Sequence, residues 1–313
     1  MSVDAERSFS DSEFVQIDSC LICHSTNLEF IGTKQTIHPQ SRFSVRIMRC
    51  RNCQHWHTDP MPKAELLSLL YSESSLSVLG KNWSSEIASN NRNEITVAPD
   101  SDWIVSSLSQ VNPGNFLEVG PGDGSLLRKM REVGWNAFGV DLGNYACGFQ
   151  VVSSIIQLPQ SVLYDAIVFR DVLEHVPDPR EELTNYAGML RQGTFLFMTV
   201  PWSESKRARF GRTDWEMVRP LGHLNYFSKK SARMLLESNK FQVLTMETIN
   251  TDGSSLFNQT KSLLKLVFRI IFRTLRPWKW KDLRNTASSM VIRIKCFPDT
   301  AGDQLYIMAR KID

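Results

Sequence analysis

The chain has 313 residues, of which 42% are hydrophobic and 22% are charged, and its formal net charge is +3. This length and composition suit one large globular domain with a smaller accessory module. A net charge of +3 is too small to indicate a nucleic-acid-binding surface by itself. No stretch has the length and apolar character of a membrane span, and the polar, acidic start predicts no signal peptide. We therefore expect a cytoplasmic protein.

The N-terminal residues carry two C-x-x-C pairs, Cys20-x-x-Cys23 and Cys50-x-x-Cys53. This spacing is typical of a structural zinc site with four thiolate ligands, whereas buried or redox-active thiols are the alternative. The competing ligands are nearby histidines, His24, His55 and His57. The last two follow the second pair and are expected to face solvent. A module this small buries little core, so a metal would supply its folding energy. We predict a zinc-ribbon-like module over residues 1–62.

The remaining elements follow in chain order. Residues 63–110 show helical spacing in "KAELLSLLY" and "DWIVSSLSQV" and are predicted to form a helical connector. From Asn115 onward, short apolar runs alternate with amphipathic segments, which predicts parallel strands joined by right-handed crossovers. The run "DQLYIMARK" is a candidate antiparallel last strand. We predict an α/β domain over residues 111–313, a doubly wound, Rossmann-like, mostly parallel seven-stranded sheet, with a helical insertion at about 251–303.

The first predicted strand runs into the glycine-rich turn "EVGPGDGS". In an open α/β sheet the ligand binds beside this turn, at the carboxyl ends of the strands. Gly120 and Gly122 let the backbone approach a ligand, and Asp141, after the second strand, can accept hydrogen bonds from ribose hydroxyls. Glu118 would repel a pyrophosphate and favour a cationic group. S-adenosylmethionine combines a ribose with an ammonium and a sulfonium, so it is the predicted cofactor.

Four ordered segments resemble successive motifs of class I S-adenosylmethionine-dependent methyltransferases: "FLEVGPGDGSLLRKM", "GVDLG", "YDAIVFRDVLEHVPDP" and "HLNYFSKKSARMLLE". The resemblance covers roughly residues 100–250 and the last strand. It implies a cofactor site at the carboxyl ends of the strands, formed by Glu118, Gly120, Gly122, Asp141, Leu142, Ser154, Ile155 and Arg170. Within this set, Ser154 and Ile155 would flank the adenine, and Arg170 would face the methionyl part or the substrate. A tight structural turn is the alternative for the glycine loop.

The sequence departs from that family after Asp141. The segment "NYACG" leaves barely one helical turn where the family has a full helix. Ser153 and Ser154 stand where the family has an acid. These departures keep open a degenerate methyltransferase domain that binds ligands without catalysis.

Methyl transfer to a hydroxyl is helped by a base with a pKa near neutrality, and histidine is the natural candidate. His223, in "GHLNYFS", matches a family histidine near the substrate pocket and is the predicted catalytic residue; a packing histidine is the alternative. Asp171 is the second candidate base, and Tyr226 could orient the substrate. His175, in "LEHVPDP", is interpreted as a structural residue.

A zinc ribbon ahead of such a domain resembles bacterial methyltransferases associated with sugars and surface polysaccharides. Residues 201–222, a predicted lid, mix two tryptophans with five cations and suit a phosphorylated ligand, although a solvated basic loop is the plainer interpretation. We predict a methyltransferase acting on a small hydroxylated metabolite, with a nucleotide-linked or lipid-linked sugar as the leading acceptor. The alternatives are an RNA-modifying methyltransferase and a non-catalytic binding protein. No specific nucleic-acid partner is expected.

Residues 261–281 are predicted to form a helix with a basic stripe, because cations recur every four residues at Lys261, Lys265, Arg269 and Arg273. Apolar residues cover most of its other surface, and Trp278 and Trp280 follow it. The segment is too short to cross a bilayer. Its apolar face would pack on this protein or a partner subunit, or contact an anionic membrane peripherally at the inner face.

Overall fold

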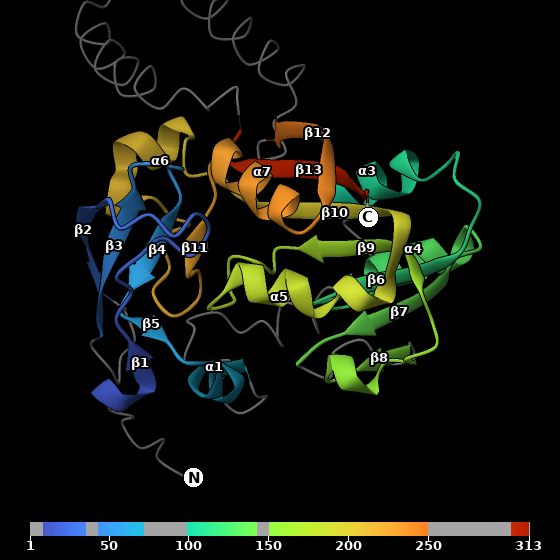
Figure 1. Ribbon diagram of the computed structural model, residues 1–313, viewed down its shortest axis with the longest axis horizontal. Coiled ribbons are helices and arrows are strands. Elements are labelled where there is room, and N and C mark those ends of the chain that lie inside the picture. The colour runs from blue at the N-terminus through green and yellow to red at the C-terminus, as the bar shows by residue number, and fades with distance from the viewer. Residues whose placement is uncertain (1–8, 36–42, 72–98, 143–149, 250–301, 313) are drawn as a thin grey trace, which may run out of the picture.

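The computed structural model describes residues 9–35, 43–71, 99–142, 150–249 and 302–312 (Figure 1). Within these ranges the strands form sheets of seven, four and two strands. The seven-stranded sheet and the four-stranded sheet lie side by side, and most of the four-stranded sheet comes from the N-terminal residues (Figure 1).

The seven-stranded sheet confirms the predicted doubly wound, mostly parallel α/β fold. Its strand order is β12-β13-β10-β9-β6-β7-β8, and β13 runs antiparallel to both of its neighbours. The first three strands of this sheet along the chain lie next to one another at one side of the sheet: β6 (Asn115–Val119), β7 (Asn136–Val140) and β8 (Gln150–Val152). Those on the other side are β9 (Tyr164–Arg170), β10 (Leu190–Pro201), β12 (Phe241–Ile249) and β13 (Gln304–Lys311). The order therefore reverses between β6 and β9, which is where such sheets bind ligands.

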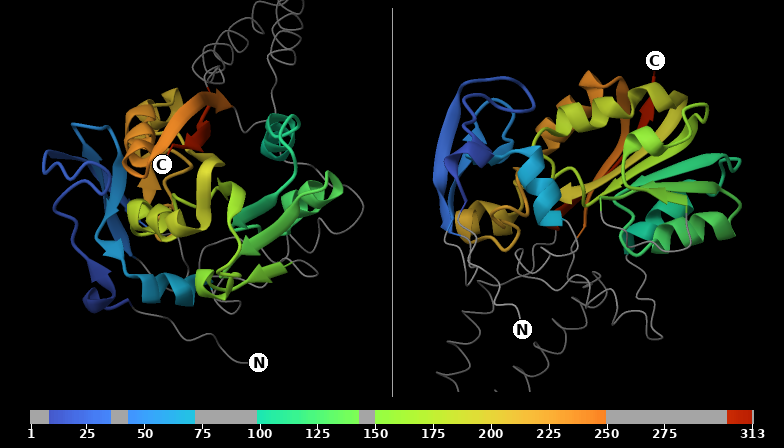
Figure 2. Two further views of the ribbon diagram at one scale, coloured as in Figure 1. Left: turned by 45° about the vertical axis from the view of Figure 1, so that its right-hand side comes forward. Right: turned by 90° about the horizontal axis from the view of Figure 1, so that it is seen from below.

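Helices cover both faces of this sheet (Figure 2). They are α3 (Pro99–Ser107), α4 (Ser125–Glu132), α5 (Pro179–Asn185) and α7 (Lys229–Ser238). Alternate residues of β9 pack into separate cores: Ile167 lies in a cluster with Leu235 of α7, and Val168 lies in another with Leu126 of α4. A strand buried on both faces must be apolar throughout, which explains the continuous run "AIVF".

Helix α5 is shorter than the amphipathic run "PREELTNYAGMLRQ" that contains it. Helix α5 begins after Asp178, whose carboxylate accepts hydrogen bonds from the backbone N–H groups of Arg180 and Glu181. It ends at Asn185, a 3₁₀ turn follows over Ala187–Met189, and β10 begins at Leu190. The last part of the pattern therefore belongs to the turn and the strand.

The four-stranded sheet has the order β11-β4-β3-β2 and is antiparallel. Three strands come from the N-terminal region, β2 (Leu28–Gln35), β3 (Ser44–Cys50) and β4 (Trp56–Asp59), whereas β11 (Asn225–Tyr226) lies far along the chain. A two-stranded sheet pairs β1 (Phe14–Val15) with β5 (Met61–Pro62), and α1 (Ala64–Tyr71) follows it. The N-terminal sheet is thus completed by a strand from the later part of the chain.

The expectation that His55 and His57 face solvent is wrong, because both side chains are 0% exposed. Strand β11 covers this region. His55 donates through Nε2 to Oδ1 of Asn225 at 3.0 Å, and its ring lies 5.0 Å from that of Phe227. The covering residues are about 170 positions away in sequence, so local spacing could not reveal them.

Several sequence-based expectations lie outside the described residues. They concern the segment 143–149 after Asp141, most of the insertion at 251–303 and the basic stripe at 261–281. Among the helices that the structure describes, none is both long and apolar enough to cross a membrane.

Substitution of Asn225 tests the connection between the two larger sheets. Its side chain is fully buried, accepts from His55 and donates to the carbonyl of Val176 at 2.7 Å. In Asn225→Ala both partners are left buried without this bond, so we expect a loss of about 2 kcal/mol in the free energy of unfolding, measured with urea. Asn136→Ala, at an exposed position, is the control. Equal losses in the two variants would show that the connection contributes little.

Candidate functional site

The glycine-rich turn lies between β6 and α4 at the carboxyl edge of the sheet. Gly120 and Gly122 both have positive φ, 68° and 54°. A Cβ on Gly120 would lie 2.7 Å from Cγ2 of Val172, whereas no atom lies within 4 Å of one on Gly122. The N–H of Gly122 donates to Oδ2 of Asp141 at 3.1 Å. The turn is therefore held against the end of β7, with open space beside Gly122 for a ligand.

The ends of three strands meet at this edge. Val119 of β6 is in register with Val140 of β7 on one side and with Phe169 of β9 on the other. Each strand is followed at once by predicted site residues, because Asp141 follows Val140 and Arg170 follows Phe169. The fold thus brings the glycine turn, Asp141 and Arg170 to one place.

Glu118 and Arg170 form a buried ion pair. Arg170 Nη2 lies 3.0 Å from Oε1 of Glu118, and Arg170 Nε lies 3.7 Å from Oδ2 of Asp100 on α3. Arg170 also donates from Nη1 to Oγ of Ser101 at 2.8 Å. Two acids surround one cation, so this corner is net negative when all three groups are ionised. Our sequence analysis missed Asp100 and Ser101, because nothing in the "DSDWIV" segment relates it to β9.

Burial dominates the electrostatics of Glu118. Its side chain is 0% exposed, and this burial raises its pKa to about 7, although the charge of Arg170 opposes the shift. A carboxyl group with such a pKa can change its charge when a ligand arrives. Perturbed groups of this kind gather at functional sites.

Asp171 has an unusual backbone for a residue other than glycine, with φ at 53°. Its Oδ1 accepts hydrogen bonds from Gln304 at 3.0 Å and Thr199 at 3.3 Å. The side chain keeps access to solvent, but the protein atoms packed around it, and then the charge of Asp100, raise its pKa to about 6. The sequence analysis named Asp171 as a candidate base, and the structure places it directly after β9 with a raised pKa.

Ser154 and Ile155, predicted to flank an adenine, follow the end of β8, and Leu142, another predicted cofactor residue, follows the end of β7. Leu142 is 64% exposed, and Ile155 opens a short 3₁₀ helix and packs partly against the core. Ser154 precedes this helix in an extended conformation. The neighbouring Ile156 is 81% exposed and was not selected from the sequence. Two exposed apolar side chains, Leu142 and Ile156, therefore lie next to the ends of β7 and β8.

A second group of polar side chains lies where the chain leaves β9. The rings of His175 and His223 are 4.8 Å apart between centroids, and His175 Nε2 lies 3.9 Å from Oε1 of Glu174. The backbone carbonyl of Glu174 accepts from the N–H groups of Leu224 and Asn225, which fixes the two segments together. The structure therefore joins the predicted catalytic His223 with His175, interpreted from sequence as structural, and with Glu174, which the sequence analysis missed. The only signal was its position in "LEH".

Burial also controls the charge in this group. Glu174 is 1% exposed, and burial raises its pKa well above the ordinary value. Burial lowers the pKa of His175 to about 4, so its imidazole is neutral near pH 7. Tyr226, predicted to orient a substrate, is 0% exposed and donates its hydroxyl to the backbone carbonyl of His223 at 2.8 Å. Tyr226 thus positions the His223 segment.

The four cysteines of the two C-x-x-C pairs converge. Sγ of Cys20 lies 3.4 Å from that of Cys53, Sγ of Cys23 lies 3.5 Å from that of Cys50, and all four sulfurs are within 4.8 Å of one another. Zinc–sulfur bonds of about 2.3 Å place tetrahedral sulfurs about 3.8 Å apart. The Cys53 thiol, through its hydrogen bond, lowers the pKa of Cys20 to about 4. The donor set therefore fits a tetrahedral metal ion.

Within residues 201–222, Trp215 and Arg207 do not form part of the predicted stacking surface. Trp215 is 1% exposed and packs edge-on against Trp56 of the N-terminal sheet. Arg207 pairs with Glu216 at 3.0 Å and Asp303 at 3.3 Å. Helix α6 (Lys206–Gly211) and the turn after it lie beside the N-terminal sheet (Figure 2). Trp215 therefore belongs to the core, and Arg207 has protein partners.

Glu118→Gln tests the charge of the buried corner. Because the folded-state pKa of Glu118 is raised from 4.5 to about 7, its contribution to stability is present at low pH and lost as pH rises through 7. The glutamine variant lacks this dependence. Wild type should lose on the order of 2 kcal/mol relative to the variant between pH 5 and pH 8, measured by urea unfolding. The exposed Glu237→Gln is the control, and parallel pH profiles for Glu118→Gln and wild type would contradict the assignment.

Comparison with known proteins identifies the middle part of the chain. Residues 101–246 match the family model described as a methyltransferase domain. A ubiquinone biosynthesis O-methyltransferase from Aeromonas salmonicida is 26% identical over 114 residues, 32% of this chain and 48% of that protein. One of the same name from Erwinia tasmaniensis is 30% identical over 122 residues, 34% of this chain and 49% of that protein. The chain thus spans about half the length of the curated relatives it matches.

Among solved structures, a Burkholderia thailandensis 1,6-didemethyltoxoflavin-N1-methyltransferase, with 1,6-didemethyltoxoflavin and S-adenosylhomocysteine bound, aligns with a TM-score of 0.48. It is 14% identical and covers 84% of this chain and 98% of that chain. The family match includes the glycine turn, Asp141, Arg170 and the Glu174–His175 segment. Residues 101–246 of this chain are therefore a methyltransferase domain.

Proposed function

We propose that the protein is an S-adenosylmethionine-dependent methyltransferase that acts on a small hydroxylated metabolite. The proposal rests on one observation: the sequence match to methyltransferases and the expected ligand-binding position of the fold fall on the same residues. The methyltransferase-domain match spans the residues that meet where the strand order reverses, including Gly122 and Asp141. Ligands bind at such a point in open α/β sheets.

The residues at this edge suit the parts of the cofactor. Asp141 lies at the turn, where its carboxylate can accept from ribose hydroxyls. Leu142 and Ile156 offer exposed apolar surface for an adenine ring, beside Ser154 and Ile155. The corner formed by Glu118, Arg170 and Asp100 carries more negative than positive charge when ionised, which favours a cationic ligand.

The second polar group would act on the acceptor. When bound, S-adenosylmethionine supplies a methyl group that is activated by positive sulfur. The chain's own task is to align the acceptor oxygen and take up its proton. His223 and Asp171 follow from the sequence as candidates for this task. Asp171 lies at the end of β9 with a pKa raised to about 6, which suits a base that works near neutrality.

A hydroxylated acceptor is supported by the names of the two curated relatives, which are O-methyltransferases. A nucleotide-linked or lipid-linked sugar is the acceptor that the sequence favours. Arg219, whose positive charge acts on Glu174 and His175, is the cation that we propose pairs with such a phosphate.

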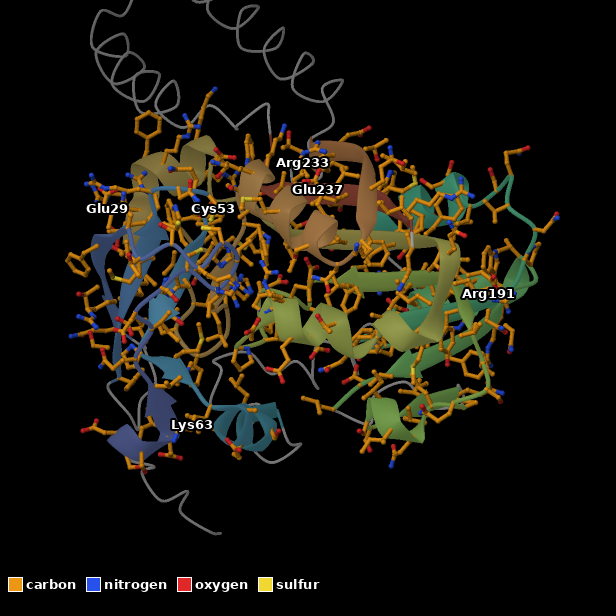
Figure 3. The ribbon with its side chains drawn as sticks, viewed as in Figure 1. Glu29, Cys53, Lys63, Arg191, Arg233 and Glu237 are labelled. Carbon is orange, nitrogen blue, oxygen red and sulfur yellow. The ribbon has the colours of Figure 1, made fainter. Side chains whose placement is uncertain are left out.

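We also propose that Cys20, Cys23, Cys50 and Cys53 hold a structural zinc ion. Four thiolates leave no open coordination position, so this ion would stabilise the module without taking part in catalysis. Figure 3 shows Cys53 on the side of the molecule occupied by the N-terminal sheet. Its backbone carbonyl accepts from the hydroxyl of Ser228 at 2.6 Å. The metal site is thus joined to the start of α7.

Cys20→Ser tests the zinc proposal. Elemental analysis should find at least one zinc per chain in wild type and one fewer in the variant. Because β11 completes the N-terminal sheet, we expect the loss to disturb residues 223–228 as well, seen as faster amide exchange there. Wild type without zinc would contradict the proposal. Unchanged amide exchange at residues 223–228 in the variant would show that the module folds independently of β11.

Asp141→Ala tests the cofactor site. Calorimetry with S-adenosylmethionine should show at least tenfold weaker binding, about 1.4 kcal/mol, because the ribose hydroxyls lose a charged acceptor. Asp18→Ala, at an exposed position in the N-terminal region, should bind as wild type does. Transfer of labelled methyl is then measured with nucleotide sugars, quinols and RNA as acceptors. Folded wild type that binds no S-adenosylmethionine would instead support a non-catalytic domain.

A further inference from the structure

Glu174, His175 and His223 bring three metal-binding side chains together outside the cysteine site. One ligand atom from each lies within 4.8 Å of the other two. Glu174 and His175 follow β9, whereas His223 precedes β11 about fifty residues later. Their convergence is fixed by backbone hydrogen bonds from Leu224 and Asn225 to the carbonyl of Glu174. The three side chains are therefore positioned by the fold.

Both imidazoles are oriented in the way that metal-binding histidines usually are. Nδ1 of His175 lies 2.7 Å from the carbonyl oxygen of Gly222, and Nδ1 of His223 lies 2.8 Å from that of Met217. A carbonyl only accepts, so each Nδ1 carries the proton and donates it. In the neutral form of each ring, the lone pair is then on Nε2. Such a second hydrogen bond fixes the tautomer and ring orientation of a metal ligand.

The carboxylate supplies a second and independent observation. The side chain of Glu174 is 1% exposed, and no hydrogen-bond donor among the described residues reaches its Oε2. An isolated buried carboxylate is costly unless it is protonated, paired or bound to a cation. Arg219 is the nearby positive charge that acts on Glu174, and Asp171 is a nearby negative one. A cation held between Glu174 and the two imidazoles would satisfy the buried oxygen.

We propose that Glu174, His175 and His223 bind a divalent metal ion, with Zn²⁺ as the ion that best suits two imidazoles and one carboxylate. Three protein ligands leave a coordination position open, unlike the four cysteines. His223 then acts on the acceptor through the metal and not as an isolated base.

The role of the open position rests on the proposed methyltransferase function. The acceptor hydroxyl would coordinate the metal, which lowers the pKa of that hydroxyl. Its proton passes to Asp171 or to water. The oxygen then forms the new bond to the methyl carbon as the carbon–sulfur bond breaks, and sulfur keeps the electron pair. No oxidant or reductant is needed.

The experiment counts zinc in the whole chain. Wild type is treated with a chelator, reloaded with excess Zn²⁺, desalted and analysed for metal. We expect two equivalents, one for the cysteines and one for the new site. Glu174→Gln and His223→Gln should each retain only one. Reloading with Co²⁺ separates the sites, because only the thiolate site gives sulfur-to-cobalt charge-transfer absorption.

A matched control uses a glutamate outside both sites. Glu237 lies on α7 beside Arg233 (Figure 3), 54% exposed and 3.6 Å from it, so Glu237→Gln should keep two equivalents. Circular dichroism confirms that each variant is folded. A single equivalent in wild type, with its cobalt spectrum purely thiolate, would overturn the proposal even if no variant folds. Two equivalents in folded His223→Gln would also overturn it. The wild-type cluster would then be a packed histidine pair beside a protonated Glu174.

Methyl transfer is measured on the same samples. His223→Gln should lower turnover at least tenfold while its S-adenosylmethionine dissociation constant stays within twofold of wild type. Two zinc equivalents without methyl transfer to any acceptor would count against the proposed function and leave the metal site standing. Methyl transfer by protein that holds only the cysteine-bound zinc would support the proposed function and count against the second metal site.

Discussion

The architecture depends on the short strand β11, which belongs to the methyltransferase domain by sequence and to the N-terminal sheet by hydrogen bonding. Asn225 and Tyr226 pair with His57 and Trp56 of β4. The backbone just before them bonds to Glu174 at the end of β9. One segment therefore holds the cysteine module against the large sheet and places His223 beside His175. Moving it would alter both the cysteine module and the polar group at the proposed acceptor site.

This arrangement means that the N-terminal module stabilises part of the methyltransferase domain. Its residues complete the surroundings of the 223–228 segment, as the buried bonds from His55 to Asn225 and from Ser228 to Cys53 show. A small module buries little apolar surface, so a metal ion would hold these contacts in place. The module thus supports the site through β11, and the proposed zinc ion need not approach the substrate.

The carboxyl edge of the sheet collects buried charge that a purely structural core would avoid. Glu118 is fully buried beside a single cation, and Asp171 has a backbone conformation that is uncommon outside glycine. Both carboxyl groups have raised pKa values. Such features reduce stability and are retained where a ligand or a reaction uses them.

The sequence by itself determined the elements whose signals are local. The strands of the large sheet are apolar runs, the glycine turn needs positive φ at Gly120 and Gly122, and the C-x-x-C spacing brings each cysteine pair together within one turn. The order of the strands predicts that Asp141 and Arg170 follow neighbouring strand ends, and both lie there in the structure. These features follow from the period of a strand, the missing Cβ of glycine and the crossover rule for parallel strands.

Only the tertiary structure decided which distant groups meet. Arg170 pairs with Glu118 and Asp100, His55 is buried under β11, and Glu174 lies beside His223. Each contact joins residues about fifty or more positions apart. The hydrophobic periodicity of the sequence does not reveal such a contact, because the contact depends on how whole elements pack and on which strand completes which sheet. For the same reason, burial and pKa, which set the chemistry of these groups, could be read only from the folded chain.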